Sequence, residues 1–350
     1  MAVMRREVKH SEDSKETVLV TGGSGYLGSW AVIGLLRKGY RVRTTIRNLA
    51  REGDVRATIA AEEDPGDRLS IVAADLLADD GWDQALHGVT YVLHMASPMP
   101  VGEFRKRDII RPAREGTQRV LKAASKAGVK RIVITSSTAA AIPKHKSGAA
   151  VDEAVWSELP SKKIYDYPRS KTLAEQDAWK FVSNAGVNME LTTVLPSQIQ
   201  GPVLGRDYSA SVDILRLMLG GRMPVVPRIG FCIVDVRDLV DLHILAMLSP
   251  TAAGERFIAA GDFLWFSDVS RILRENLGDR AVKAPTRTLP DMLVRFGGLF
   301  NSELAQIAPN LGQRTNYSSV KADRLLGWRT RAASESIIDA AASLIARGYV

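Results

Sequence analysis

The first two hundred residues alternate between short apolar runs and longer segments whose apolar residues recur at helical spacing. The first of these runs, 17–20, is apolar and rich in β-branched residues, which predicts a buried strand. The expected strands are 17–20, 41–46, 69–73, 90–95, 131–135 and 190–195; the expected helices are 29–38, 104–127 (with a kink near Pro112) and 167–185. Strands alternating with helices predict an α/β fold with a doubly wound parallel sheet.

The pattern becomes less regular after Pro196, where glycines and prolines interrupt the chain. Short helices are expected at 209–219, 236–248, 267–277 and 334–346. We therefore expect a dinucleotide-binding domain at 16–200, to which 231–260 returns. A smaller, mostly helical substrate-binding portion is expected at 201–230 and 261–350. Residues 1–15 are charged and are expected to form a disordered leader.

Composition excludes several kinds of protein. The net charge of +8 is dispersed along the chain, without the basic stripe that nucleic-acid binding needs. The single cysteine, Cys232, excludes an intrachain disulfide, and the five histidines show no metal-binding spacing, so no metal is expected. No apolar run reaches the roughly 18 residues of a membrane span. We expect a cytoplasmic protein.

Residues 21–28, Thr-Gly-Gly-Ser-Gly-Tyr-Leu-Gly, lie between the first predicted strand and the first predicted helix. Gly22 permits a tight turn, Gly25 lets a pyrophosphate approach the backbone, and Gly28 lets the helix pack closely. The helix N-terminus then offers N–H groups and a partial positive charge to phosphates. The segment predicts a dinucleotide site; a glycine-rich turn without a ligand is the alternative.

Tyr167 and Lys171 are four residues apart in a predicted helix, which places them on one face. An ammonium beside a phenol stabilises phenolate, so we expect Lys171 to lower the pKa of Tyr167 from about 10. Tyr167 would then exchange a proton near neutral pH. A second pair with this spacing, Tyr317 and Lys321, lies in the C-terminal region, away from the parallel strands, and is not expected to be catalytic.

Four hydroxyl residues, 135–138, follow the fifth predicted strand. A hydroxyl there can hydrogen-bond a substrate oxygen and stabilise developing charge. The alternative is a polar strand end that satisfies its own backbone. Taken alone, the segment favours the second interpretation. Together with Tyr167 thirty residues further on and the glycine segment upstream, it favours the first.

In these motifs the sequence resembles the extended short-chain dehydrogenase/reductase family. The resemblance is to the branch of dihydroflavonol reductases, cinnamoyl-CoA reductases and bacterial carbonyl or aldehyde reductases. The matching segments are residues 21–28, 75–76, 94–98, 135–137, 167–171, 195–202, 234–239 and 326–328. The resemblance implies a Rossmann-like fold. It also implies that Tyr167 protonates a carbonyl oxygen, that Lys171 tunes Tyr167 and holds the nicotinamide ribose, and that Ser137, or else Ser136, positions the carbonyl.

The resemblance implies further cofactor contacts. These are Asp75 and Leu76 at the adenine, Ala96, Ser97 and Pro98 along the cofactor path, Pro196 at the nicotinamide, and Thr21, Tyr26, Leu27 and Thr135 nearby. Ordinary loop roles are the alternative for the residues around 75, 96 and 196. Many relatives carry an asparagine in the helix after the fourth strand; residues 112–117 contain none, which leaves the route of a proton relay open.

The end of the second strand carries no carboxylate, the residue that NAD-specific sites use to bind the ribose 2′-hydroxyl. Arg47 stands there instead, and a guanidinium pairs with a 2′-phosphate. Arg51 and Arg56 could assist. We therefore expect NADP rather than NAD; stacking of Arg47 on the adenine of either cofactor is the alternative.

The leading hypothesis is NADPH-dependent reduction of a ketone or aldehyde, and the reverse oxidation. The alternatives are an NAD-dependent nucleotide-sugar epimerase or dehydratase of the same family and a non-catalytic NADP-binding sensor. Aromatic and methionine residues around 218–227, 263–266 and 292–300 suit an apolar small-molecule substrate, although core packing explains them equally well. A homodimer is an expectation from the family.

Overall fold

The computed structural model describes residues 16–98, 108–144, 148–158, 160–162 and 166–350. Within these residues seven strands form one parallel sheet in the order β10-β6-β5-β4-β1-β2-β3. They are β1 (Thr17–Thr21), β2 (Arg41–Ile46), β3 (Leu69–Ala73), β4 (Tyr91–His94), β5 (Arg131–Thr135), β6 (Glu190–Pro196) and β10 (Arg256–Ala259). The predicted α/β, Rossmann-like fold class is confirmed. The predicted leader lies outside the described residues.

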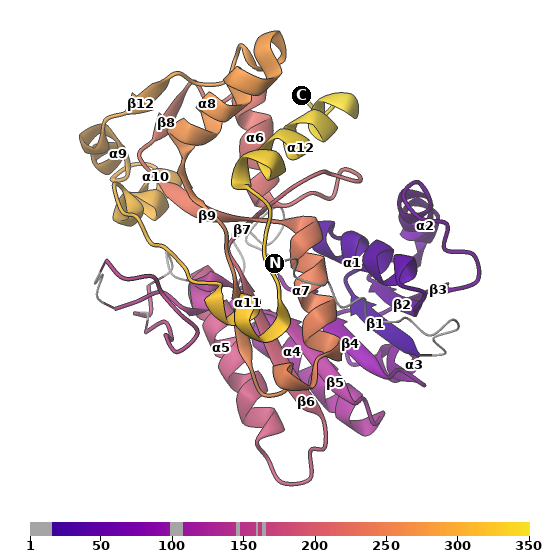
Figure 1. Ribbon diagram of the computed structural model, residues 1–350. Helices are drawn as coiled ribbons and strands as arrows, with labels where there is room; N and C mark the ends of the chain where they lie inside the picture. The colour runs from indigo at the N-terminus through magenta and orange to yellow at the C-terminus, as the bar shows by residue number, and fades with distance from the viewer. Residues whose placement is uncertain (1–15, 99–107, 145–147, 159, 163–165) are drawn as a thin grey trace, which may run out of the picture.

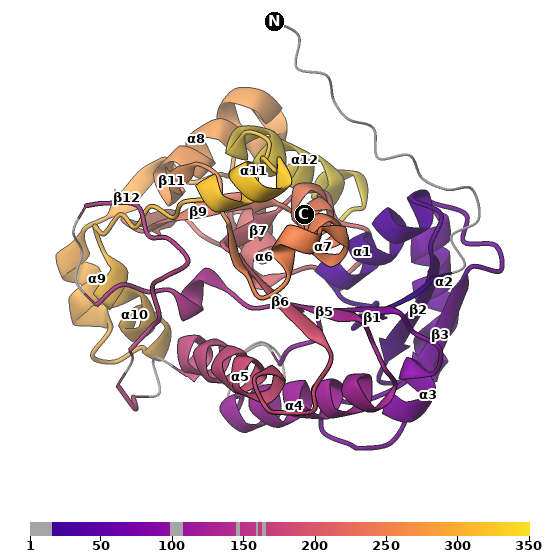
Figure 2. The same cartoon turned by 60° about the horizontal axis from the view of Figure 1, so that its bottom comes forward.

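Helices cover both faces of this sheet, as Figure 2 shows. One face packs against α1 (Tyr26–Arg37) and α7 (Val236–Leu248), and the other against α3 (Trp82–Leu86), α4 (Ile110–Lys126) and α5 (Asp166–Val182). Alternate residues of β1 follow this division, since Val18 and Val20 join the core under α1 while Leu19 joins the core under α4. All three are fully buried, which explains why the strand is apolar without alternation.

The order of the strands creates a switch point between β1 and β4. The chain runs outward from β1 through β2 and β3, then returns to β4 and runs outward through β5 and β6 in the opposite direction. The segments that follow β1 and β4 therefore diverge at the carboxyl edge of the sheet, which is where ligands bind in open α/β sheets. The glycine segment follows β1, and the hydroxyl segment follows β5, at this edge.

The C-terminal part of the chain forms a second layer of small elements around α6, α8 and α12, at the top of Figure 1. Its small sheets are β11-β9-β7 and β12-β8. Their strands are β7 (Gln198–Gln200), β8 (Val225–Pro227), β9 (Gly230–Asp235), β11 (Phe263–Trp265) and β12 (Arg287–Leu289). The remaining α-helices are α2 (Glu52–Ala60), α6 (Ala210–Leu219), α8 (Phe266–Leu277), α9 (Asp291–Gly297), α10 (Ser302–Ile307), α11 (Val320–Leu326) and α12 (Ala333–Ala346). The 3₁₀ helices include Leu49–Arg51, Thr138–Ala140, Pro250–Ala252, Gly278–Ala281 and Ala308–Asn310.

Two of the segments that carried the family resemblance, 234–239 and 326–328, meet in this layer. The indole N–H of Trp328 donates to the Asp238 carbonyl (2.6 Å), and the guanidinium of Arg331 contacts the Asp238 carboxylate (2.8 Å). These contacts fasten the segment after α11 to α7, which packs on the large sheet. The two segments therefore have a structural explanation in this chain.

The predicted helix boundaries need two corrections. The kink expected near Pro112 is wrong, because α4 begins at Ile110 and Pro112 lies in its first turn, where proline is tolerated. Residues 104–107 of that predicted helix lie outside the described residues. The first helix begins at Tyr26, three residues earlier than predicted. Among the described residues, no helix combines the length and apolarity that crossing a membrane requires.

Candidate active site

The glycine segment closes tightly on itself, in a way that excludes side chains. Gly22 has a φ of +76°, in the left-handed region. A Cβ on Gly23 would lie 2.0 Å from Thr44 Oγ1, and a Cβ on Gly28 would lie 2.1 Å from the carbonyl oxygen of Gly22. Because α1 begins at Tyr26, residues 26–28 form its first turn, whose N–H groups have no partner within the helix. The segment is thus a bare backbone cradle at a helix N-terminus, the arrangement that binds a phosphate.

The side chain of Thr21 is engaged by contacts within the protein. Its Oγ1 accepts the N–H groups of Met95 and Ala96 (both 3.0 Å), so its own proton is donated to His94 Nδ1 (2.9 Å). Thr21 is fully buried. Its hydroxyl therefore joins the end of β1 to the end of β4, and only its backbone remains for the cofactor contact predicted from the sequence.

Other predicted cofactor residues lie around the same edge. Ala96 is next to the glycine turn, since a Cβ on Gly22 would meet it at 3.2 Å. The Asp75 carboxylate accepts the Leu77 N–H (3.0 Å), and the Leu76 carbonyl accepts a guanidinium N–H of Arg119 (2.9 Å). Both residues directly follow β3 and are half-buried, as is Ser97, while Pro98 and Pro196 are buried. Tyr26 is buried, and its hydroxyl donates to the Gly201 carbonyl (2.7 Å).

Arg47 directly follows β2 and is exposed. The next residue, Asn48, caps a 3₁₀ helix by accepting the Ala50 N–H (2.9 Å). Arg51 pairs with Asp207, and Arg56 pairs with Glu52 (3.4 Å). The two arginines that could assist Arg47 are therefore already engaged with carboxylates.

The structure brings Ser137, Tyr167 and Lys171 together. Tyr167 and Lys171 lie one turn apart on α5, and Lys171 Nζ donates to the Thr135 carbonyl at the end of β5 (3.3 Å). Ser137 hydrogen-bonds Tyr167, and its Oγ also accepts the Ala139 N–H (3.1 Å). Ser136 points elsewhere, because its Oγ donates to Glu175 Oε2 (2.5 Å). Of the two serines, Ser137 is the one in contact with the tyrosine.

Burial governs the ionisation of these groups. It raises the pKa of Tyr167 above its usual value, and the hydrogen bond from Ser137 works in the opposite direction. The expectation that Lys171 lowers the pKa of Tyr167 is therefore wrong for this structure, since burial outweighs the lowering and the lowering group is Ser137. Burial also lowers the pKa of Lys171 to about 8, opposed by the charge of Glu175. At neutral pH the site holds a phenol and an ammonium.

Thr135 connects the lysine to a buried histidine on α7. Its Oγ1 contacts His243 Nε2 (2.8 Å), and His243 Nδ1 contacts the Leu239 carbonyl (2.8 Å). Because a carbonyl only accepts, Nδ1 carries the proton and Nε2 accepts the hydroxyl of Thr135. Burial lowers the pKa of His243 to about 4, so it is neutral. The Thr135 carbonyl, not its side chain, faces Lys171.

Residues 18–260 match the NAD dependent epimerase/dehydratase family. The chain belongs to this family. The match covers the whole large sheet except the first residue of β1, and it includes the glycine cradle and the tyrosine–lysine pair.

Relatives within the family include reductases. The chain is 34% identical over 270 residues to cinnamoyl-CoA reductase 1 of Oryza sativa subsp. japonica, covering 76% of this chain and 77% of that protein. It is 31% identical over 350 residues to tetraketide alpha-pyrone reductase 1 of Arabidopsis thaliana, covering 97% and 98%. Among solved structures, Gre2 of Candida albicans in complex with NADPH has a TM-score of 0.78 at 26% identity and covers 95% of this chain and 99% of that chain. The resemblance stated from the motifs is confirmed.

The second tyrosine–lysine pair does not reproduce the first. Tyr317 precedes α11, so it and Lys321 do not share a helix face. The Tyr317 hydroxyl donates to the Thr138 carbonyl (3.3 Å), whereas Lys321 Nζ pairs with Glu255 (2.5 Å). Separate partners hold the two side chains. That this pair is not catalytic stays a prediction.

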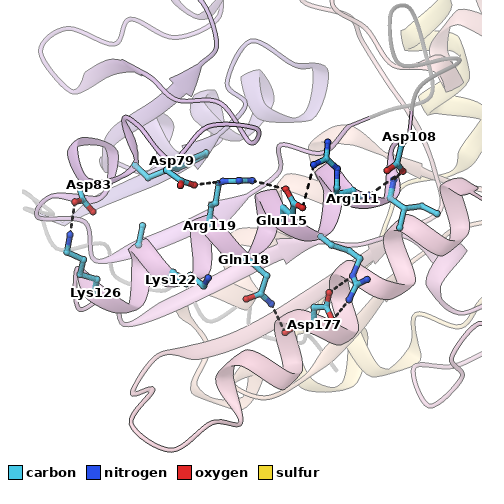
Figure 3. Close-up of a pocket in the computed structure, with 14 residues that line it drawn as sticks. Asp79, Asp83, Asp108, Arg111, Glu115, Gln118, Arg119, Lys122, Lys126 and Asp177 are labelled. Carbon is cyan, nitrogen blue, oxygen red and sulfur yellow. Dashed lines mark hydrogen bonds and ion pairs between the residues drawn. The ribbon is translucent and has the colours of Figure 1, made fainter.

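The surface hollow of about 970 Å³ in Figure 3 lies along the outer side of α4, away from this site. Its charged side chains compensate one another: Arg119 lies between Asp79 (2.5 Å) and Glu115 (3.7 Å), and Lys126 pairs with Asp83 (2.6 Å). The hollow touches α5 at Asp177, whereas Lys171 is buried against the sheet. The volume of a surface hollow therefore does not by itself identify the candidate active site of this molecule.

The segments suggested for the substrate have mixed environments. Met218 and Val226 are core residues, Phe263 and Trp265 are half-buried, and most of residues 292–300 is exposed. Sequence reasoning missed three buried polar residues around Ser137, Tyr167 and Lys171: Glu175, His243 and Arg256. Only Glu175 carried a local signal, since it lies four residues beyond Lys171 and thus on the same helix face.

Proposed function

We propose that this chain is an NADPH-dependent oxidoreductase that reduces a ketone or aldehyde to an alcohol, and catalyses the reverse oxidation. The observation that carries the proposal is the meeting of Ser137, Tyr167 and Lys171 at the sheet edge that also bears the glycine cradle. A carbonyl oxygen beside Tyr167 would find a proton donor and a hydroxyl in one place.

The cradle fits the cofactor, because Gly23 and Gly28 leave no room for a Cβ and expose backbone N–H groups at the start of α1. Arg47, with no carboxylate at the end of β2, supports NADP over NAD by pairing with a 2′-phosphate. NADPH-bound Gre2, at 26% identity, supports the same choice.

NADPH supplies a hydride when bound. Tyr167 is a phenol at neutral pH, because burial raises its pKa, and it donates its proton to the carbonyl oxygen. Ser137 holds that oxygen beside Tyr167, and the Lys171 ammonium, one turn along α5, would hold the nicotinamide ribose. The main chain at Thr135 holds Lys171 in place. In the oxidation direction Tyr167 takes the proton back.

The test is the loss of NADPH absorbance at 340 nm with a panel of aromatic and aliphatic carbonyls. We expect turnover by the wild-type chain and its loss in Tyr167→Phe. The matched control is Tyr317→Phe, which removes the same hydroxyl from the second pair and should retain turnover. No oxidation across the panel would overturn the proposal, and tightly bound NAD in the purified protein would point to the epimerase or dehydratase alternative.

An apolar or aromatic substrate fits the half-buried Phe263 and Trp265. The homodimer, the cytoplasmic location and the division into 16–200 with 231–260, against 201–230 with 261–350, stay predictions.

A further inference from the structure

Three strands of the large sheet, β5, β6 and β10, and the helix α5 that covers them meet at the carboxylate of Glu175. Glu175 lies on α5 and is 2% exposed. Its Oε2 accepts the Ser136 hydroxyl beyond β5 (2.5 Å), and its Oε1 accepts the Thr193 hydroxyl of β6 (2.8 Å) and Nε of Arg256 of β10 (2.8 Å). A buried carboxylate with this many charged and polar donors is fixed in one orientation.

Arg256 is fixed from its other side. Its Nη1 donates to the carbonyls of Glu153 (2.5 Å) and Val155 (2.9 Å), and its guanidinium lies 3.7 Å from the centre of the Trp156 ring. Arg256 is 8% exposed, so the ion pair with Glu175 is out of water. The carboxylate is therefore anchored to parts of the chain that do not belong to α5.

Glu175 is coupled to the catalytic group in two ways. Ser136, which it holds, is the neighbour of Ser137 in the chain. Lys171 lies one turn before it on the same helix face, and Tyr167 lies two turns before it. The Ser137 hydroxyl and the side chains of Tyr167 and Lys171 are thus all positioned relative to one buried group, the Glu175 carboxylate.

Among the described residues, the groups that face Lys171 from other elements are uncharged, so Glu175 is its one charged partner. From β5 the Thr135 carbonyl accepts its proton, and from β4 His94 is neutral because burial and the nearby lysine lower its pKa to about 3. Tyr167 is a phenol at neutral pH. Glu175 is the group that raises the pKa of Lys171 against the effect of burial.

We propose that Glu175 is a positioning residue for the reaction: it holds Ser136, and through the chain Ser137, in register with Tyr167 and Lys171, and its charge faces the Lys171 ammonium. The inference rests on the proposed function, because it assigns those three residues to the reduction. Glu175 itself touches neither substrate nor cofactor in this account.

The two couplings can be separated by two variants. Glu175→Gln keeps the shape and removes the charge, so Lys171 should lose its proton about one pH unit lower. The alkaline fall of kcat/KM should shift down by the same amount. Ser136→Ala keeps the charge and removes the hydrogen bond, so kcat should fall about tenfold with the position of the alkaline fall unchanged. If Glu175→Gln does not fold because Arg256 is left unpaired, the double variant Glu175→Gln/Arg256→Met removes both charges and replaces it.

The matched control is Glu190→Gln. Glu190 pairs with the buried Arg131 at the amino ends of β6 and β5 (2.6 Å), so its loss tests what breaking a carboxylate–arginine pair does to the fold alone. We expect lower stability in Glu190→Gln with an unchanged pH profile.

A second readout does not depend on turnover. In protein labelled with ¹³C-lysine, the Cε resonance of Lys171, assigned by its loss in Lys171→Arg, reports the proton on Nζ directly. A titration midpoint that falls in Glu175→Gln and not in Glu190→Gln supports the inference. An unchanged midpoint overturns it. If the wild-type chain turns over no carbonyl, the proposed function fails, while this titration still decides whether Glu175 controls the charge of Lys171.

Discussion

Replacing Gly28 with alanine should weaken NADPH binding more than it weakens the fold. The new Cβ would lie 2.1 Å from the Gly22 carbonyl oxygen and 2.8 Å from its carbonyl carbon. Both atoms belong to the backbone of the cradle, so no side chain can rotate away. Relief of the contact requires the cradle and the first turn of α1 to separate by about 1 Å.

The magnitude follows from what that separation breaks. Overpacking costs about 1–3 kcal/mol, and alanine returns up to about 1 kcal/mol of helix propensity, so the net loss of stability is about 0–2 kcal/mol. Binding loses at least one charge-assisted hydrogen bond from an N–H to a phosphate, worth about 1.5–3 kcal/mol. The Kd for NADPH should therefore rise at least about tenfold.

The assay is a fluorescence titration with NADPH beside urea unfolding, with Gly34→Ala as the matched control. Gly34 lies on the same helix, and its Cβ would meet Val240 Cγ1 at 2.7 Å, on the side facing α7. Gly34→Ala should change the free energy of unfolding and leave the Kd unchanged. A Gly28→Ala variant that binds NADPH within twofold of the wild type would refute the reasoning.

Three further outcomes are expected. Arg47→Asp should lower the NADPH/NADH ratio of kcat/KM by at least about tenfold, since it removes a pairing with the 2′-phosphate; steady-state kinetics with both cofactors check this. Arg131→Met should lower the free energy of unfolding, measured by urea titration, by about 3 kcal/mol, because Arg131 is buried and donates to three carbonyls around the end of α7. The control Arg41→Met, which removes an exposed ion pair, should lower it by less than about 1 kcal/mol. Burial lowers the pKa values of His94 and His243 to about 3 and about 4, so below about pH 6.5 the unfolded chain binds protons that the folded chain does not. The free energy of unfolding at pH 5 should therefore be lower by about 2 kcal/mol per histidine than at neutral pH, and His243→Gln should halve this loss.

The large sheet was readable from the sequence because most of its strands are short runs of apolar and β-branched residues. The predicted bounds of β2, β3 and β5 agree with the structure. β5 is buried except at its last residue, Thr135, which is half-buried, whereas β3, at the edge of the sheet, exposes Ser70 and Ala73. The helices α2 and α3 were missed. Residues 52–60 include Gly53 and carry only two large apolar residues, Val55 and Ile59, and α3 spans little more than one turn, so neither segment is long enough to show a clear helical periodicity. The three-residue strands β7, β8, β11 and β12 are too short to alternate visibly.

The candidate site likewise contains residues that a local motif reveals and residues that only contacts between distant parts of the chain bring in. The cradle, Tyr167 and Lys171 were found because each motif lies within one strand–turn–helix unit or one helix. His243 and Arg256 were missed because they reach Thr135 and Glu175 from 108 and 81 residues away, and no local spacing records such a contact. The tyrosine's pKa was misjudged for a related reason, since the sequence reveals the neighbouring lysine but not the depth of burial.

Burial at the site has a cost that the surrounding polar groups limit. At neutral pH the Lys171 ammonium is held in the protein although its pKa has fallen by more than two units from its usual value, a destabilisation of about 3 kcal/mol. A fold selected for stability alone would place an apolar residue there. The contacts that reduce this cost are the Thr135 carbonyl and the charge of Glu175, whose carboxylate also pairs with Arg256. Because His94 is kept neutral, it adds no second positive charge beside the lysine. The buried polar residues that the sequence did not reveal are therefore the ones that make a charged lysine tolerable next to a protonated tyrosine, and the two halves of the site depend on each other.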